Sequence, residues 1–212
     1  MESAFWHERW ENQQIGFHQL HTHELLLKYF TRVVKPGAKV FVPLCGKSND
    51  MLWLLEKGYR VFGVELSELA ARQFFEENQL KPKITQRGDF KEYALDELVI
   101  WVGDFFKLVK SDLADIDAWY DRAAMIALPP EMRQRYVQQL CEQLPEQAKG
   151  LLITLQYPDG YREGPPFSVL EGEVEVGYGQ RFSIDQLESA ETTVNGKEAD
   201  DNPVTEQVYK LD

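Results

Sequence analysis

The sequence is poor in cysteine, in long apolar runs and in basic residues, and each shortage excludes a class of protein. Its two cysteines, Cys45 and Cys141, lie far apart and form no CxxC pair, so neither a disulfide framework nor a zinc site is expected. Purely apolar runs extend over only a few residues, and the first residues lack the pattern of a signal peptide. These features predict a cytoplasmic protein without a membrane span.

Acidic residues outnumber basic ones by 35 to 23, which gives a net charge of -12. Such a charge repels nucleic-acid phosphates and anionic lipids unless a local basic patch intervenes, and the sequence contains no such patch. A chain of 212 residues suits one well-buried core. We therefore expect a single-domain monomer whose partner is a small molecule, with no nucleic acid and no membrane.

Runs of β-branched and aromatic residues alternate along the chain with segments of helical periodicity. Strands are expected at residues 38–43, 59–65, 97–103, 116–122, 150–156, 181–188 and 204–211, and helices at residues 49–57, 67–78, 130–144 and 168–177. The alternation predicts an α/β, Rossmann-like domain: a mostly parallel seven-stranded sheet, covered on both faces, with an antiparallel edge at the C-terminus.

Two segments fit this scheme less directly. Residues 5–34 form an N-terminal extension with two helical segments, and residues 79–96 look variable, with a short hairpin arm at residues 89–95 given little weight. Both lie outside the expected alternation of strand and helix.

The stretch V-F-V-P-L-C-G-K-S, residues 40–48, ends like a phosphate-binding loop. Gly46, Lys47 and Ser48 match the end of the Walker A pattern, but Phe41 stands where its first glycine is required. A single glycine still permits close backbone approach by a ligand without phosphates. Lys47 is then expected at the surface and Ser48 as a helix cap.

Cys45 lies inside this stretch and leaves two interpretations open. It is either a small buried residue or a reactive thiol. No histidine is close in sequence to activate it, which favours the buried residue.

Acidic residues follow two of the predicted strands. Glu65 ends a strand nineteen residues after Gly46, and Asp104 follows Gly103 at the end of another. Ligands of open α/β sheets bind at these strand ends, and an acid about twenty residues past a glycine turn accepts the hydroxyl groups of a ribose. The G-x-G-x-x-G of a dinucleotide site is absent, so the pattern favours S-adenosylmethionine, with a nucleotide-binding or regulatory module as the alternative.

Six motifs occur in the order and spacing of one known family. They are F-W-H-E-R-W-E-N (5–12), G-F-H-Q (16–19), F-V-P-L-C-G-K-S (41–48), G-V-E-L-S (63–67), Y-D-R-A-A (120–124) and G-P-P-F (164–167). Over roughly residues 5–167 the sequence resembles the thiopurine S-methyltransferases in their bacterial form. The last forty-odd residues match less well.

The resemblance implies a class I methyltransferase domain over residues 1–212, with residues 1–34 as a helical lid over S-adenosylmethionine. The implied cofactor-binding residues are Trp6, Trp10, Phe17, Leu44, Glu65, Asp104 and Arg122. Arg122 is also the implied catalytic residue, because the family's matching arginine lies near the transferred methyl group and the acceptor. The loop at residues 157–168 is implied to cover the acceptor pocket, with Tyr157, Pro165, Pro166 and Phe167 as its walls.

Residue types alone leave simpler interpretations of these positions open. Trp6 and Trp10, four residues apart, would also fasten the first helix to the domain. Arg122 would also suit an ion pair with Asp121 or Asp104.

The histidines at 18, 21 and 23 could suggest a metal, but their spacing does not match one face of a helix, and no metal site is expected. Residues 189–202 are polar and acidic. The resemblance implies that this segment supplies further residues near the acceptor.

The implied reaction is methyl transfer from S-adenosylmethionine to the sulfur of thiopurines or related aromatic thiols, with selenium and tellurium compounds as further acceptors. Displacement at a sulfonium by a thiolate needs alignment and desolvation and no covalent nucleophile. A methyltransferase for oxygen or nitrogen would usually need a general base or a metal, and the sequence shows no obvious one.

Overall fold

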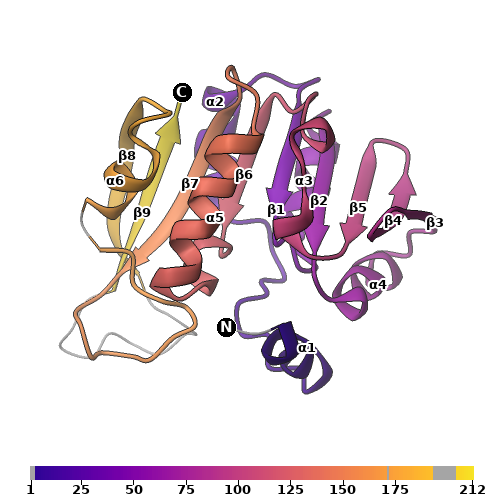
Figure 1. The fold of residues 1–212 in the computed structure, drawn as a ribbon, viewed down its shortest axis with the longest axis horizontal. Coiled ribbons are helices and arrows are strands. Elements are labelled where there is room, and N and C mark those ends of the chain that lie inside the picture. The colour runs from indigo at the N-terminus through magenta and orange to yellow at the C-terminus, as the bar shows by residue number, and fades with distance from the viewer. Residues whose placement is uncertain (1–2, 171, 193–203) are drawn as a thin grey trace.

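The computed structural model describes residues 3–170, 172–192 and 204–212 (Figure 1). Within them the strands are β1 Lys39–Pro43, β2 Arg60–Glu65, β3 Lys83–Arg87, β4 Phe90–Leu95, β5 Leu98–Val102, β6 Ala118–Arg122, β7 Lys149–Gln156, β8 Ile184–Thr192 and β9 Val204–Leu211. The α-helices are α1 Ser3–Glu11, α2 Glu24–Val33, α3 Asp50–Glu56, α4 Glu68–Glu77, α5 Pro130–Gln143 and α6 Glu173–Tyr178. Three short 3-10 helices are η1 Phe105–Lys107, η2 Lys110–Asp112 and η3 Met125–Ala127.

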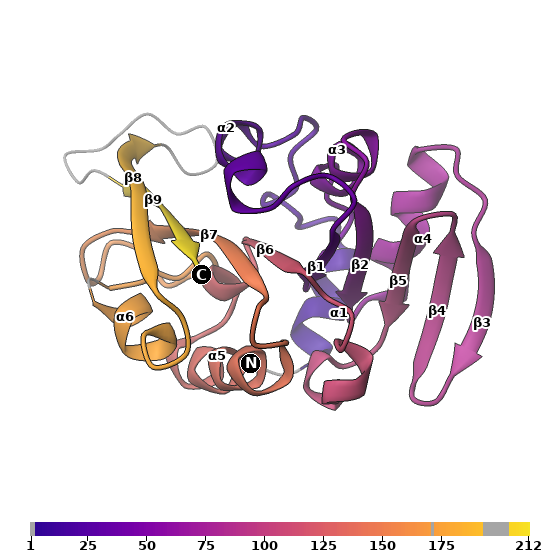
Figure 2. The ribbon, with the colours of Figure 1, turned by 90° about the horizontal axis from the view of Figure 1, so that it is seen from above.

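All described strands form one sheet in the order β3-β4-β5-β2-β1-β6-β7-β9-β8 (Figure 2). The five central strands are parallel, because β1 pairs in parallel with β2 and β6, β2 with β5, and β6 with β7. Antiparallel pairs flank them on both sides. This confirms the α/β, mostly parallel fold with an antiparallel C-terminal edge.

The described sheet has nine strands, so the predicted count of seven is wrong by the β3–β4 hairpin. This hairpin lies in the segment that the sequence left as variable. β3 is largely exposed and has Ile84 as its one large apolar residue, so it shows no apolar alternation.

Helices cover both faces of the sheet. Figure 2 shows α2, α3 and α4 on one side and α5 and α6 on the other. Successive side chains of a strand point to opposite faces, so in β1 Phe41 joins the core under α5, whereas Val40 and Val42 join the core under α2 and α3. Residues on both faces are fully buried, which explains why the central strands are apolar runs rather than alternating ones.

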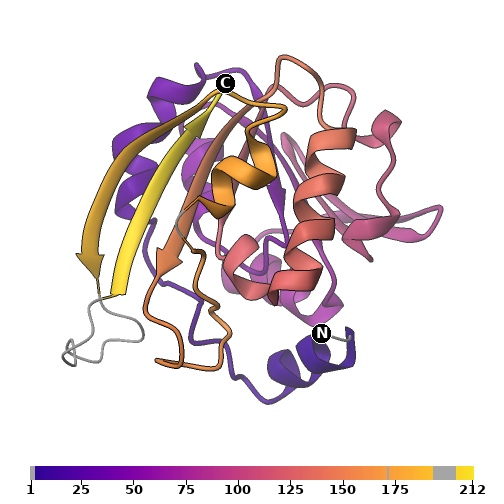
Figure 3. The same cartoon turned by 60° about the vertical axis from the view of Figure 1, so that its left-hand side comes forward.

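Two predicted elements begin later than expected. The helix predicted at residues 168–177 is α6, which begins at Glu173. The preceding residue, Gly172, has a left-handed backbone with φ of +79°, so the right-handed helix cannot extend back through it. The strand predicted at residues 181–188 is β8, which begins at Ile184 because the N–H groups of Arg181 and Phe182 bond to the carbonyl of Tyr178 in a turn. Figure 3 shows β9 between β7 and β8 at this edge.

In the part of the chain that the structure describes, no helix has both the length and the apolarity to cross a membrane. The two helical segments expected in residues 5–34 are α1 and α2. Residues 193–202 of the acidic segment expected near the acceptor lie outside the described residues.

Candidate functional site

A cavity of about 710 Å³ opens at the carboxyl ends of the parallel strands, and its lining includes residues of α1 and of the loops that follow the strands. Figure 1 shows α1 beyond these strand ends. The strand order reverses between β1 and β6, the place where open α/β sheets bind ligands, and the volume suits a small molecule. Its lining includes all seven predicted cofactor residues: Trp6, Trp10, Phe17, Leu44, Glu65, Asp104 and Arg122. The fold thus brings to one cavity residues that are spread over more than half of the chain.

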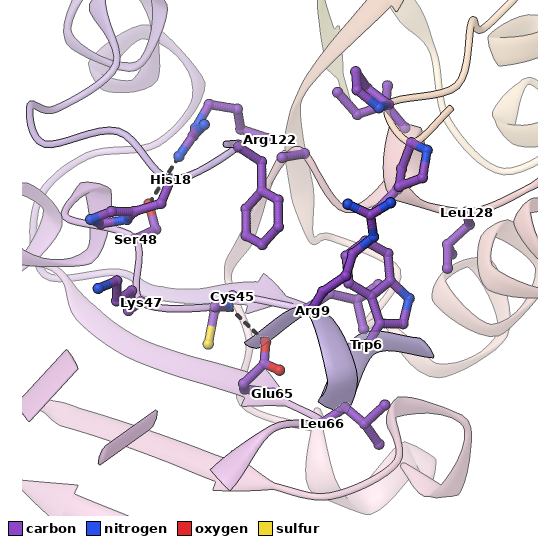
Figure 4. A pocket seen from close by; sticks show the side chains of 18 of the residues that line it. Trp6, Arg9, His18, Cys45, Lys47, Ser48, Glu65, Leu66, Arg122 and Leu128 are labelled. Carbon is purple, nitrogen blue, oxygen red and sulfur yellow. Dashed lines mark hydrogen bonds between the residues drawn. The ribbon is translucent and has the colours of Figure 1, made fainter. Parts of the chain in front are cut away.

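Glu65, at the end of β2, fixes the loop that follows β1. Its Oε2 accepts a hydrogen bond from the Gly46 N–H at 2.8 Å, and its Oε1 accepts one from the Ser67 N–H at 2.7 Å. Burial raises the pKa of this carboxyl, and the N–H groups of Ser67 and Gly46 oppose the rise. Each carboxylate oxygen keeps a lone pair for a ligand hydroxyl, and Figure 4 shows the carboxylate at the cavity.

Gly46 has a left-handed backbone and a close neighbour in α1. Its φ is +54°, and a Cβ built there would lie 3.3 Å from the Trp10 ring. Glycine therefore permits both the turn and the close packing of Trp10 against it, and Trp10 is 3% exposed.

Replacing Gly46 by alanine is expected to lower the free energy of unfolding by about 1 kcal/mol, because of the left-handed backbone. It should also weaken the binding of S-adenosylhomocysteine, the demethylated form of the cofactor that the sequence implies, by about tenfold, because the added methyl displaces Trp10. Urea denaturation and isothermal titration calorimetry measure the two effects. Gly37→Ala is the matched control, with φ of +94° and no heavy atom near the added Cβ. Equal ligand affinity in the two variants would contradict this account of Gly46.

Three aromatic rings from residues 3–20 form one side of the cavity. The ring of Phe17 meets those of Trp6 and Trp10 edge-on, with centroid distances of 6.0 and 5.6 Å. Trp10 packs on the Gly46 loop and so fastens α1 to the domain, as the simpler interpretation expected. All three aromatic residues also line the cavity.

Arg122, at the end of β6, is held by a buried carboxylate that the sequence did not indicate. Its Nε donates to Asp50 Oδ2 at 2.8 Å, and its Nη2 lies 3.2 Å from Ser48 Oγ. Asp50 is 1% exposed and also accepts the Tyr120 hydroxyl at 3.0 Å and the His23 N–H at 2.8 Å. Asp50 therefore joins the start of α3 to β6 and to the start of α2.

The alternative of an ion pair between Arg122 and Asp121 or Asp104 is not the one found, because the carboxylate that Arg122 contacts is that of Asp50. Adjacent residues of a strand point to opposite faces, so Asp121 lies under α5. There it accepts the Tyr136 hydroxyl at 2.6 Å and two backbone N–H groups, and burial raises its pKa to about 6. Asp104 accepts the Phe106 N–H at 2.9 Å and caps η1, while lining the cavity.

Comparison with models of known families identifies the family of this chain. The model described as Thiopurine S-methyltransferase (TPMT) matches residues 1–212. The chain belongs to the thiopurine S-methyltransferase family. A thiopurine S-methyltransferase of Pseudomonas entomophila is 48% identical over 214 residues, covering 100% of this chain and 99% of the relative. One of Shewanella sp. (strain W3-18-1) is 48% identical over 188 residues, covering 88% and 86%.

Solved structures agree on the fold. The 1,6-didemethyltoxoflavin-N1-methyltransferase of Burkholderia thailandensis, solved with S-adenosylhomocysteine, aligns with a TM-score of 0.68 at 13% identity, covering 99% of this chain and 86% of that one. A SAM-dependent methyltransferase of Anabaena variabilis aligns with a TM-score of 0.66 at 15% identity, covering 99% and 95%. The chain therefore has the fold of SAM-dependent methyltransferases.

At the Gly-Lys-Ser end of residues 40–48, the side chains of Lys47 and Ser48 have partners within the protein. Lys47 was predicted to lie at the surface, but it is only 8% exposed, and its Nζ lies 2.6 Å from the carboxylate of Glu77 in α4. Ser48 is not the helix cap: Asn49 occupies that position, and the Ser48 hydroxyl accepts the Asp50 N–H at 3.2 Å. Lys47 and Ser48 are thus bonded within the protein.

The structure also separates the two interpretations of Cys45. Its side chain is 6% exposed, and burial raises the pKa of the thiol well above its ordinary value, with the neighbouring Glu65 adding to the rise. A buried thiol with a raised pKa carries little thiolate, so the structure favours the buried residue.

Half of the predicted acceptor wall lines the cavity. Pro165 and Pro166 belong to the lining, whereas Tyr157 and Phe167 do not. The Tyr157 hydroxyl instead donates to the Pro166 carbonyl at 2.7 Å, so Tyr157 supports the loop from behind. Motif matching alone does not distinguish a wall from its support.

His23 has partners within the protein, whereas His18 lines the cavity. His23 Nδ1 accepts the Leu25 N–H at 3.3 Å, which caps α2, and its Nε2 lies 3.3 Å from Glu206. His18 lines the cavity, and burial lowers its pKa, with Lys47 adding to the effect. Among the described residues, no three His, Cys, Asp or Glu side chains are arranged to hold a metal.

Several functional residues escaped the sequence. For Asp50 and Arg9 the sequence does hold a signal, namely their closeness to predicted site residues. Asp50 follows the Gly46 loop, and Arg9 lies three residues after Trp6 and so on the same helical face. Thr192 and Glu206 also line the cavity, from the ends of β8 and β9. They come from the last forty-odd residues, which match the family's motifs less well.

Proposed function

We propose that this chain transfers the methyl group of S-adenosylmethionine to the sulfur of thiopurines or related aromatic and heterocyclic thiols. The observation that carries the proposal is the cavity at the strand ends of a member of this family, where the Glu65 carboxylate and three lid rings face the same space. When bound, S-adenosylmethionine supplies a methyl group on a positively charged sulfur.

The residues around the cavity suit this cofactor. The Glu65 carboxylate would accept the ribose hydroxyls, the loop at Leu44 would meet the methionine part, and Asp104 would lie at the adenine end. The rings of Trp6, Trp10 and Phe17 supply electron-rich faces that attract a sulfonium and exclude water. Arg122 would position the acceptor, because Asp50 holds its guanidinium at the cavity wall.

The rest of the proposal concerns the molecule as a whole. Residues 1–212 form one methyltransferase domain, residues 1–34 close over the cofactor, and the protein acts as a monomer in the cytoplasm. The net charge of -12 supports a small-molecule acceptor over nucleic acid. Selenium and tellurium compounds are further acceptors of this class, because they are soft nucleophiles like a thiolate.

Two measurements test the proposal. Purified protein with methyl-labelled S-adenosylmethionine should give a labelled thioether from 6-mercaptopurine or thiophenol, and little product from catechol. S-adenosylhomocysteine should raise the melting temperature, whereas Mg-ATP should not. Absence of product from every thiol would contradict the assigned acceptor, and stabilisation by Mg-ATP alone would favour a nucleotide-binding module.

A further inference from the structure

The cavity is lined by three permanently or usually charged basic residues, and they differ in their partners. Arg122 is bonded to Asp50 and Ser48, and Lys47 is bonded to Glu77. Arg9 has no ion pair within the described part of the chain, and its Nε is buried without a hydrogen-bond acceptor. Arg9 is therefore the lining cation whose charge the described residues leave unmatched.

The acidic residues of the lining do not serve Arg9. Glu65 is engaged by backbone N–H groups, Asp104 by the Phe106 N–H, and Glu206 by His23. The Arg9 guanidinium instead lies over the face of the Phe5 ring, with 4.6 Å between the guanidinium carbon and the ring centroid. A ring face attracts a cation but accepts no directed hydrogen bond as a carboxylate does.

An unpaired guanidinium at a partly buried site indicates a ligand. Arginine stays protonated in proteins, so it cannot shed its charge as a buried lysine can. Burial of a charge without a partner is unfavourable, and an anion that enters the cavity removes that penalty. The ligand of Arg9 is thus expected to be negatively charged or to become so on binding.

The position of Arg9 favours the acceptor over the cofactor. In Figure 4 Arg9 and Trp6 lie toward Leu128, whereas Lys47 and Ser48 lie on the opposite side of the view. The cavity lining includes, besides Leu128, the apolar residues Ile126, Met132, Leu155, Pro165 and Pro166. An apolar wall with one unmatched cation suits a flat aromatic ring that carries an anionic sulfur.

We propose that Arg9 recognises the ionised sulfur of the acceptor and favours binding of the thiolate over the thiol. This role rests on the proposed function. The acceptor's proton leaves to solvent before transfer. A lone pair of the thiolate then forms the new bond to the methyl carbon, while the electrons of the broken bond go to the cofactor's sulfur, so both charges vanish and no further base is required.

The test compares Arg9→Gln and Arg9→Lys with Arg32→Gln. Arg32 also packs over an aromatic ring, that of Tyr29 at 5.3 Å, but lies outside the cavity lining. Arg9→Gln should raise the KM for 6-mercaptopurine by about ten- to a hundredfold, the range of a charge-assisted hydrogen bond, and leave the Kd of S-adenosylhomocysteine unchanged. Arg9→Lys should recover much of the loss, and Arg32→Gln should resemble the unaltered protein.

A spectroscopic measurement avoids turnover. The ultraviolet spectrum of 6-mercaptopurine changes when it ionises, so a pH titration in the presence of protein and S-adenosylhomocysteine reports the bound thiolate. The unaltered protein should shift this titration to lower pH, and Arg9→Gln should not. Circular dichroism and melting temperature confirm that each variant is folded.

The outcomes are distinct. If Arg9→Gln bound S-adenosylhomocysteine more weakly but kept its KM for the acceptor, Arg9 would be assigned to the cofactor's carboxylate and the inference would be overturned. Unchanged constants and an unchanged titration in Arg9→Gln would also overturn it. If the unaltered protein turned over no thiol, the proposed function would fail and this inference with it.

Discussion

Replacing Glu65 by alanine is expected to weaken the binding of S-adenosylhomocysteine by at least about 100-fold, because two charge-assisted hydrogen bonds to the ribose are lost. The same change leaves the buried N–H groups of Gly46 and Ser67 without their acceptor. Each unsatisfied group costs about 1 to 3 kcal/mol, so the free energy of unfolding should also fall. Calorimetry measures the affinity and urea denaturation the stability.

Glu68→Ala is the matched control for Glu65. Glu68 lies three residues further on, and its carboxylate accepts bonds from Lys91 and the Tyr93 hydroxyl away from the cavity lining. Its removal should leave ligand affinity unchanged. If Glu65→Ala bound S-adenosylhomocysteine as tightly as the Glu68→Ala protein, the ribose role of Glu65 would be wrong.

Replacing Asp50 by alanine is expected to lower the free energy of unfolding by about 3 to 5 kcal/mol, the effect of removing one partner of a buried ion pair. Arg122 would lose its carboxylate, and the Tyr120 hydroxyl and the His23 N–H would lose their acceptor. Because Arg122 would no longer be held, methyl transfer should also fall. Urea denaturation and turnover measured at saturating S-adenosylmethionine separate the two effects.

Asp115→Ala provides the comparison for Asp50. The ion pair of Asp115 with Lys39 has the same distance of 2.8 Å, but the Asp115 side chain is 62% exposed. Exposed pairs contribute about 0 to 1 kcal/mol, so this variant should be close to the unaltered protein. Similar losses in the two variants would show that Asp50 does not act as a buried charge.

The sequence predicted best where one strand and its following turn carry the signal. The central strands are apolar, β-branched runs bounded by polar or glycine residues, and the Gly46 to Glu65 spacing corresponds to a hydrogen bond of 2.8 Å between the two residues. Spacing works here because β1 and β2 are neighbours and end at the same edge of the sheet. Local pattern and tertiary contact then coincide.

Prediction failed where a partner lies far away in sequence. Lysine is usually exposed, so nothing near Lys47 indicated its burial against Glu77, thirty residues on. For Arg122 the sequence left open an ion pair with Asp121 or Asp104, but its partner is Asp50, seventy-two residues before it. Such pairings depend on which faces of which elements meet, and the residue types alone do not specify that.

The cavity is assembled from two parts of the sheet with different construction. The end that we propose for the cofactor comes from the parallel strands, through Leu44 and Glu65, whereas Thr192 and Glu206 enter from the antiparallel edge and Pro165 from a loop. Substitutions at this edge alter the cavity without touching the Gly46 and Glu65 contact. Under the proposed function, acceptor preference is therefore free to diverge during evolution while the methyl donor is retained.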